Sequence, residues 1–91
     1  MRIAGYIEHP PFHVTVFEMN HRYSIKIELE GLEQWYKIRP SDKVTGLNDI
    51  KAVLNEKFWN GVKSVFHKMK KNDAAILEEI FLEEEDDIDI L

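Results

Sequence analysis

The stretch that most constrains the fold is residues 48–72, the longest run with helical spacing. Apolar residues recur there three and four positions apart, which is the period of a helix with one buried face. The spacing predicts one helix of roughly 36 Å at 1.5 Å per residue, with Asn48 as N-cap and Asn72 as its C-terminal stop. The Asn60-Gly61 pair leaves a kink open as an alternative. The stripe consists of Leu47, Ile50, Leu54, Phe58, Val62, Val65, Phe66 and Met69.

This apolar stripe is wider than one contact surface requires. Trp59 lies about half a turn from Ile50, so the stripe spans roughly 180°, whereas a helix on a single surface needs roughly 100°. We therefore expect a sheet to cover one side and a second body to cover Trp59 and Phe66. That body is either the next segment of this chain or a partner subunit. The side expected to face the sheet comprises Ile50, Leu54, Phe58 and Val65.

Four stretches before this helix favour β-strands, because β-branched and aromatic residues alternate with polar ones. They are residues 3–7, 12–19, 22–30 and 34–39, the last ended by Pro40. A four-residue loop at 8–11 and two-residue turns at Asn20-His21 and Glu30-Gly31 would join them into an antiparallel meander. In this register one face is apolar. That face comprises Ile3, Gly5, Ile7, Phe12, Val14, Val16, Tyr23, Ile25, Ile27, Leu29, Tyr36 and Ile38, with Ile7 opposite Phe12.

The last part of the chain predicts a short acidic helix. Asp73 can cap residues 74–84, whose apolar stripe is too short to be stable without docking. That stripe consists of Ile76, Leu77, Ile80 and Phe81. The expected contacts of this helix, or of an oligomer, are Trp59, Phe66, Ile76, Ile80 and Phe81. We therefore predict an α+β fold of two layers (ββββαα): a four-stranded antiparallel β-meander, one long helix packed on one face, and a short acidic helix. Residues 1–84 form one domain, and residues 85–91 form a flexible acidic tail.

The charge of the chain is divided between its two parts. Residues 1–72 carry 12 basic and 8 acidic side chains, a net charge of +4, whereas residues 73–91 carry 9 acidic and no basic ones. A basic body with an acidic end has three interpretations. The end increases solubility, docks on the basic body of the same chain, or occupies a basic partner by mimicking nucleic acid.

The second face of the predicted sheet is the candidate interaction surface. Aromatic and basic side chains alternate on it, and a contiguous exposed apolar patch usually marks a contact surface. Aromatic rings between basic groups can also stack on nucleobases and hold phosphates, although Glu28, Glu30 and Glu33 oppose phosphate binding. The alternative is that the short helix or a second subunit covers this face. The surface consists of Phe17, Met19, Arg22, Lys26, Trp35, Lys37 and Arg39.

The sequence shows no constellation typical of an enzyme. The chain has no cysteine, which excludes thiolate chemistry and fits a reducing compartment. Its four histidines lack the spacing of a metal site, and its four glycines form no phosphate-binding loop. Glu18 is expected on the core face opposite Tyr23, at the rim of the sheet. We expect no catalytic residue, no metal and no cofactor. Without a signal peptide or a membrane span, we expect a cytoplasmic location.

Three segments resemble small bacterial proteins of unknown function: IAGYIEHP, then VTVFEMNHRYSIKIELEGLEQWYKIR, and the helical stretch after them. The resemblance covers roughly the first seventy residues and implies no catalytic or binding residue. From the residues themselves we expect a non-enzymatic protein-interaction module that associates with itself, as a dimer, or with another protein. The alternative is a nucleic-acid-binding domain that uses the second sheet face and is modulated by the acidic end.

Overall fold

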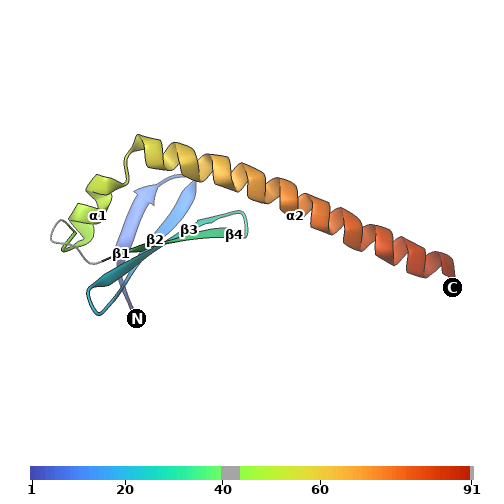
Figure 1. Cartoon of the computed structure of the whole chain (residues 1–91), viewed down its shortest axis with the longest axis horizontal. Helices are drawn as coiled ribbons and strands as arrows, with labels where there is room; N and C mark the ends of the chain where they lie inside the picture. The colour runs from blue at the N-terminus through green and yellow to red at the C-terminus, as the bar shows by residue number, and fades with distance from the viewer. Residues whose placement is uncertain (40–43, 91) are drawn as a thin grey trace.

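The computed structural model describes the backbone of residues 1–39 and 44–90, and the side chains of residues 1–39 and 44–81. The first half of the chain is one antiparallel sheet in the order β1 (Arg2–His9), β2 (Phe12–Met19), β3 (Arg22–Leu29) and β4 (Leu32–Ile38). Two helices follow, α1 (Leu47–Val53) and α2 (Glu56–Ile90), and the first part of α2 lies over one face of the sheet (Figure 1). The predicted α+β fold with a four-stranded meander is confirmed. Pro40, the expected end of the fourth strand, lies outside the described residues.

The two hairpins that join β2, β3 and β4 have the predicted registers. Met19 pairs with Arg22 and Leu29 pairs with Leu32, so each turn contains two residues. The backbone φ is positive at both residues of each turn, Asn20-His21 and Glu30-Gly31. Turns of this kind match the twist of paired strands and favour Asn and Gly. The predicted turns and the registers that follow from them are therefore confirmed.

The expected loop at residues 8–11 is wrong. The turn contains only Pro10 and Pro11, and His9 pairs with Phe12. The two prolines lack an amide hydrogen, but Glu8 and His9 retain theirs and extend β1 to the turn. Pairing therefore shifts by two residues from the expected register, and Ile7 lies opposite Val14.

A bulge at Ala4 corrects the predicted position of Ile3. Ile3 pairs with Phe17, whereas Gly5 pairs with Val16, so one residue of β1 is extra. An extra residue reverses the faces of the side chains before it. Ala4 packs against the core and Ile3, which is 50% exposed, shares the outer face with Phe17.

The predicted single helix over residues 48–72 is wrong, because a break separates α1 from α2. Leu54 leaves the helical region with φ −83° and ψ 72°. Asn55 begins the next helix: its Oδ1 accepts a hydrogen bond of 3.0 Å from the Phe58 amide. The predicted cap at Asn48 is also wrong, since Gly46 precedes the first turn of α1 without a side-chain cap. The Asn60-Gly61 pair lies inside α2, which is continuous there.

The break changes which side chains of α2 face the sheet. The direction of each side chain was predicted by counting 100° per residue from Ile50, and this count does not hold across the non-helical residues between α1 and α2. The face assigned to Trp59 and Phe66 is therefore wrong. Trp59, Val62 and Phe66 are buried in the core. Val65, expected against the sheet, is 41% exposed. The excess width of the apolar stripe thus came from joining two helices with different orientations.

The predicted short acidic helix and its docking on Trp59 and Phe66 are wrong as well. α2 continues through Asn72 and Asp73 without a break, because neither residue is a strong helix terminator and no Pro follows. The structure measures 63 × 27 × 19 Å, and α2 extends far beyond the sheet (Figure 1). The division at residue 84, with residues 85–91 as a flexible tail, stays a prediction.

Candidate interaction surfaces

The packed part of α2 is fixed to the sheet by aromatic and polar contacts. The Trp59 ring stacks on His9 with 4.0 Å between centroids, and its Nε1 donates a hydrogen bond of 3.1 Å to the Leu54 carbonyl. Buried Gln34 of β4 donates from Nε2 to the Val62 carbonyl at 3.0 Å. The Tyr36 hydroxyl donates to the Oε1 of Gln34, and burial raises the pKa of this hydroxyl. Together these contacts hold the packed part of α2 in one position on the sheet.

The other face of the sheet carries a hollow of about 950 Å³. It forms where β2, β3 and β4 present their outward side chains at the end of the sheet opposite the Pro10-Pro11 turn. The structure brings together six of the seven residues that the sequence predicted for this surface. Its lining consists of Met1, Phe17, Met19, Arg22, Tyr23, Ser24, Trp35, Lys37, Ile38 and Arg39.

Lys26 is the seventh predicted residue, and it lies beside this hollow in a cluster with two aromatic rings. The Phe17 and Trp35 rings stack at 5.5 Å between centroids, and the Lys26 Nζ lies 5.7 Å from each. The same Nζ contacts the Glu28 carboxylate at 3.1 Å. The indole Nε1 of Trp35 donates to Glu33 at 3.0 Å. One face of each aromatic ring and the charge of Lys26 thus make contacts within the protein. Less ring surface and less positive charge are therefore free to contact a nucleotide.

Charge on the outer face changes sign along the strands. Glu8, His13, Glu28 and Glu33 occupy one row of paired positions across the sheet. Arg22, Ser24 and Lys37, with Arg39, occupy the rows at the other end. A uniformly basic surface suits phosphate better than such a gradient does.

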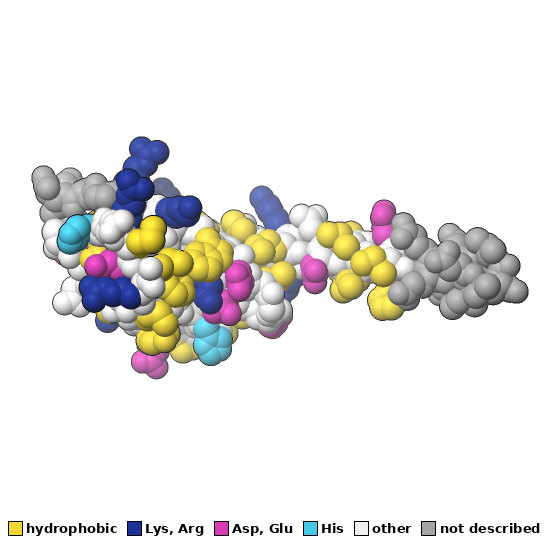
Figure 2. Space-filling model, turned by 90° about the horizontal axis from the view of Figure 1, so that it is seen from below, with side chains coloured by type: hydrophobic (Ala, Val, Ile, Leu, Met, Phe, Trp, Pro, Cys, Tyr) yellow, Lys and Arg dark blue, Asp and Glu magenta, His cyan; other side chains and the backbone are white. Residues whose placement is uncertain are grey.

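The second candidate surface is the part of α2 beyond Lys70, which we call the free half. Lys70 lies near the last turn over the sheet, where its Nζ pairs with the Glu30 carboxylate. Every described side chain from Lys70 to Phe81 is exposed. Viewed from below, hydrophobic side chains gather on the sheet body and again along the protruding helix (Figure 2). Among the side chains that the structure describes, the large apolar residues of the free half are Ile76, Leu77, Ile80 and Phe81.

A smaller hollow of about 290 Å³ lies where α2 leaves the sheet. Phe12, Leu29 and Phe66 provide apolar surface, and Lys63, His67 and Lys70 of α2 lie along one side. Pro11 completes the lining. We call it the exit groove. It offers an apolar floor beside basic side chains.

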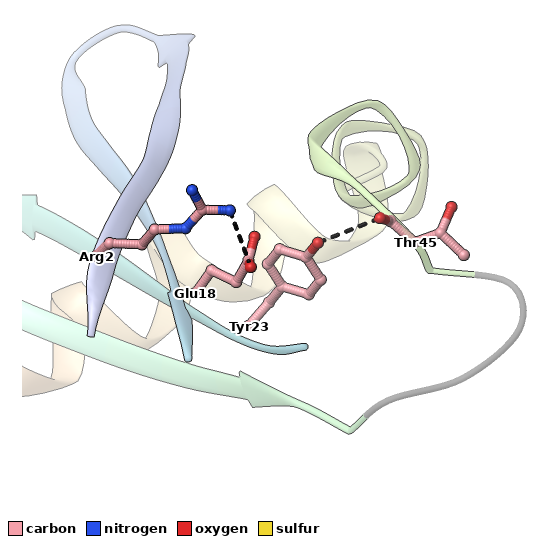
Figure 3. Close-up of polar contacts among 4 residues, drawn as sticks. All are labelled: Arg2, Glu18, Tyr23 and Thr45. Atoms are coloured by element: carbon pink, nitrogen blue, oxygen red, sulfur yellow. Dashed lines mark hydrogen bonds and ion pairs between the residues drawn. The ribbon is translucent and has the colours of Figure 1, made fainter. Parts of the chain in front are cut away.

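Glu18 and Tyr23, expected opposite each other at the rim of the sheet, have separate partners. Its carboxylate accepts from the Arg2 guanidinium at 3.0 Å, while the Tyr23 hydroxyl donates to the Thr45 carbonyl at 3.2 Å (Figure 3). Both groups are engaged in structural contacts at the sheet end. Among the described residues, no three His, Asp or Glu side chains gather closely enough to hold a metal ion.

Three residues with defined roles were missed in the sequence. Gln34 interrupts an apolar face, a position where a buried amide commonly binds a backbone group. Asn55 followed by Glu56 is a helix-start signal. His9 gave no signal of its own, since its stacking on Trp59 depends on the β1–β2 register.

Comparison of the chain with models of protein families, curated proteins and solved structures found no match. The resemblance to small bacterial proteins stays a prediction. Over the described part of the chain, no helix combines the length and the hydropathy needed to cross a membrane.

Proposed function

We propose that this protein is a non-enzymatic interaction module that associates with other copies of itself in the cytoplasm. The observation that supports this function best is the apolar stripe of α2, which continues past the end of the sheet. Ile76 and Ile80 follow Val62, Phe66 and Met69 at helical spacing, so one side of the helix is buried in its first half and exposed in its second. Exposed apolar stripes of this kind usually contact a partner.

The length of α2 supports the same function. Most helical stability in proteins comes from packing of an apolar face, and the free half has no packing within the described chain. A partner that covers Ile76, Leu77, Ile80 and Phe81 would supply it. Association with a second copy needs no other component.

Sedimentation velocity and light scattering of the full chain at micromolar concentrations test this proposal. We expect a dimer whose fraction rises with concentration. Replacing Ile76 and Ile80 by Asp should shift the protein to monomer without unfolding it, because both side chains are exposed. A matched variant is Lys57→Asp with Lys68→Asp on the outer side of α2, which should still dimerise. A wild-type protein that is monomeric at every concentration would rule the proposal out.

The second candidate function is nucleic-acid binding by Arg22, Lys26, Trp35, Lys37 and Arg39. Its specific support is the hollow in which Arg22, Lys37 and Arg39 lie with Trp35. Fluorescence anisotropy with a labelled single-stranded oligonucleotide at low salt tests it. Binding should weaken with added salt and in Lys37→Ala with Arg39→Ala, but not in Lys57→Ala with Lys68→Ala. Absence of binding at low salt would end this candidate.

A further inference from the structure

We propose that two copies of this chain pair through antiparallel α2 helices, with the free half of each in the exit groove of the other. The inference rests on the proposed self-association and specifies the surfaces that meet. Its carrying observation is that Leu77 and Phe81 of the free half lie on the same flank of α2 as the basic residues of the groove.

The common flank follows from heptad spacing. Lys63, Lys70 and Leu77 are each seven residues apart, as are His67, Ala74 and Phe81. Residues seven apart in a helix project in nearly the same direction. Lys63, His67 and Lys70 border the exit groove, and Leu77 and Phe81 are exposed farther along.

A two-fold axis perpendicular to α2 places this flank of one copy against the same flank of the second copy. With the axis near Asn72, Leu77 and Phe81 of one copy reach the turns of the other copy that hold Lys63 and His67. Closed two-fold contacts of this kind use the same surface on both subunits. The apolar floor of Phe12, Leu29 and Phe66 then lies beside the free half of the second copy.

Charge selects the antiparallel direction. From residue 56 to 72, α2 carries five Lys and one Glu, a net charge of +4. From residue 73 to 90 it carries nine acidic side chains and no basic one. Parallel helices would place acidic half on acidic half, whereas antiparallel helices place each acidic half beside a lysine-rich half. Charge complementarity of this kind fixes orientation as well as partner.

A charge exchange between two full-length variants tests the arrangement. The first variant carries Lys63→Glu and Lys70→Glu, and the second carries Asp73→Lys and Glu78→Lys. All four positions are exposed, so both variants should keep the helical signal of the wild type. Each alone should dimerise about ten-fold more weakly or worse, since like charges then meet at both ends of the pair. An equimolar mixture should recover a heterodimer, because opposite charges meet again at both ends.

The matched control carries Lys57→Glu and Lys68→Glu, which change the net charge equally on the opposite flank of α2. It should dimerise like the wild type. Because the chain has no cysteine, a single Ala74→Cys variant gives a second readout, since exposed Ala74 lies on the contacting flank close to the proposed axis. It should form a disulfide-linked dimer on oxidation, whereas Lys57→Cys should not, since antiparallel pairing separates the two copies of residue 57 by roughly 45 Å.

The outcomes separate this inference from the proposed function. If the wild type dimerises, but the Lys63/Lys70 and Lys57/Lys68 variants dimerise equally well, the helices do not pair as proposed and self-association stands. Self-linking by Lys57→Cys as readily as by Ala74→Cys would likewise overturn the antiparallel arrangement. A monomeric wild type would overturn both.

Discussion

The two halves of α2 share one continuous backbone and one apolar stripe, yet only the first half has a sheet beneath it. Phe66 in the packed half is 2% exposed, and Phe81 in the free half is 61% exposed. The first half also receives a hydrogen bond from Gln34 and stacks Trp59 on His9. A periodic pattern therefore identifies the side of a helix that seeks apolar contact, but not whether the same chain provides that contact.

The largest expected difference between the halves is in the cost of removing one phenyl ring. Phe66→Ala should lower the free energy of unfolding by about 3–5 kcal/mol, because it leaves a cavity between α2 and Phe12. Phe81→Ala should change it by less than about 0.5 kcal/mol in a dilute, monomeric sample. Urea denaturation followed by Trp fluorescence measures both. Equal costs would mean that the free half is packed in the monomer.

Gln34→Ala tests the polar contact between β4 and the packed half. The substitution removes the donor to the Val62 carbonyl and the acceptor of the Tyr36 hydroxyl. Loss of such buried partners costs about 1–3 kcal/mol. Its control is Glu33→Ala, one residue away on the outer face, for which thermal unfolding should show little change. A similar midpoint for both variants would show that the Gln34 contacts contribute little.

Asn55→Ala tests where the packed half begins. Removing the side chain that accepts from the Phe58 amide should destabilise the protein by about 1 kcal/mol. Asn48→Ala is the comparison, since Asn48 was the predicted cap and α1 has no side-chain cap hydrogen bond. Its effect should be within about 0.5 kcal/mol. Circular dichroism during urea titration distinguishes the two, and a larger loss from Asn48→Ala would favour one unbroken helix.

The smallest effect is expected at Gly61. A Cβ built there meets no atom within 4 Å, so Gly61→Ala should stabilise the packed half by about 0.5–1 kcal/mol and raise the unfolding midpoint. Ala75→Gly in the free half should weaken the helical signal locally and leave that midpoint unchanged in monomeric protein. A lower midpoint for Gly61→Ala would mean that close backbone contact requires the glycine.

The part of the sheet formed by β2, β3 and β4 could be predicted from the sequence because its rules are local, whereas the register of β1 was predicted wrongly. Two-residue turns with Asn20-His21 and Glu30-Gly31 fixed two registers, and these registers placed Phe17 and Trp35 on one outer face. The bulge at Ala4 had no local signal, since Ile3 and Gly5 fit the alternation equally well without it.

The helical region was less predictable, because one missed break changes the predicted direction of every side chain that follows it. One unrecognised break at Leu54-Asn55 reversed the assigned directions of Trp59 and Val65. Because a helix end was expected at Asn72, the prediction missed the feature that distinguishes this molecule, namely a helix that extends far beyond its sheet. Both errors concern helix boundaries, which depend on a few backbone angles rather than on the apolar pattern.

The Gln34 contact also has a consequence for the tip of α2. The helix past Lys70 extends for roughly 30 Å, so a tilt of about 5° in the packed half moves the end of a straight helix by about 2–3 Å. That displacement approaches the diameter of a water molecule and is enough to separate two packed side chains. The hydrogen bond from Gln34 to the Val62 carbonyl and the Trp59–His9 stack thus stabilise the fold and also set the direction in which the free half of α2 projects. Substitutions in the core should therefore weaken the proposed association while leaving every residue of the proposed contact unchanged.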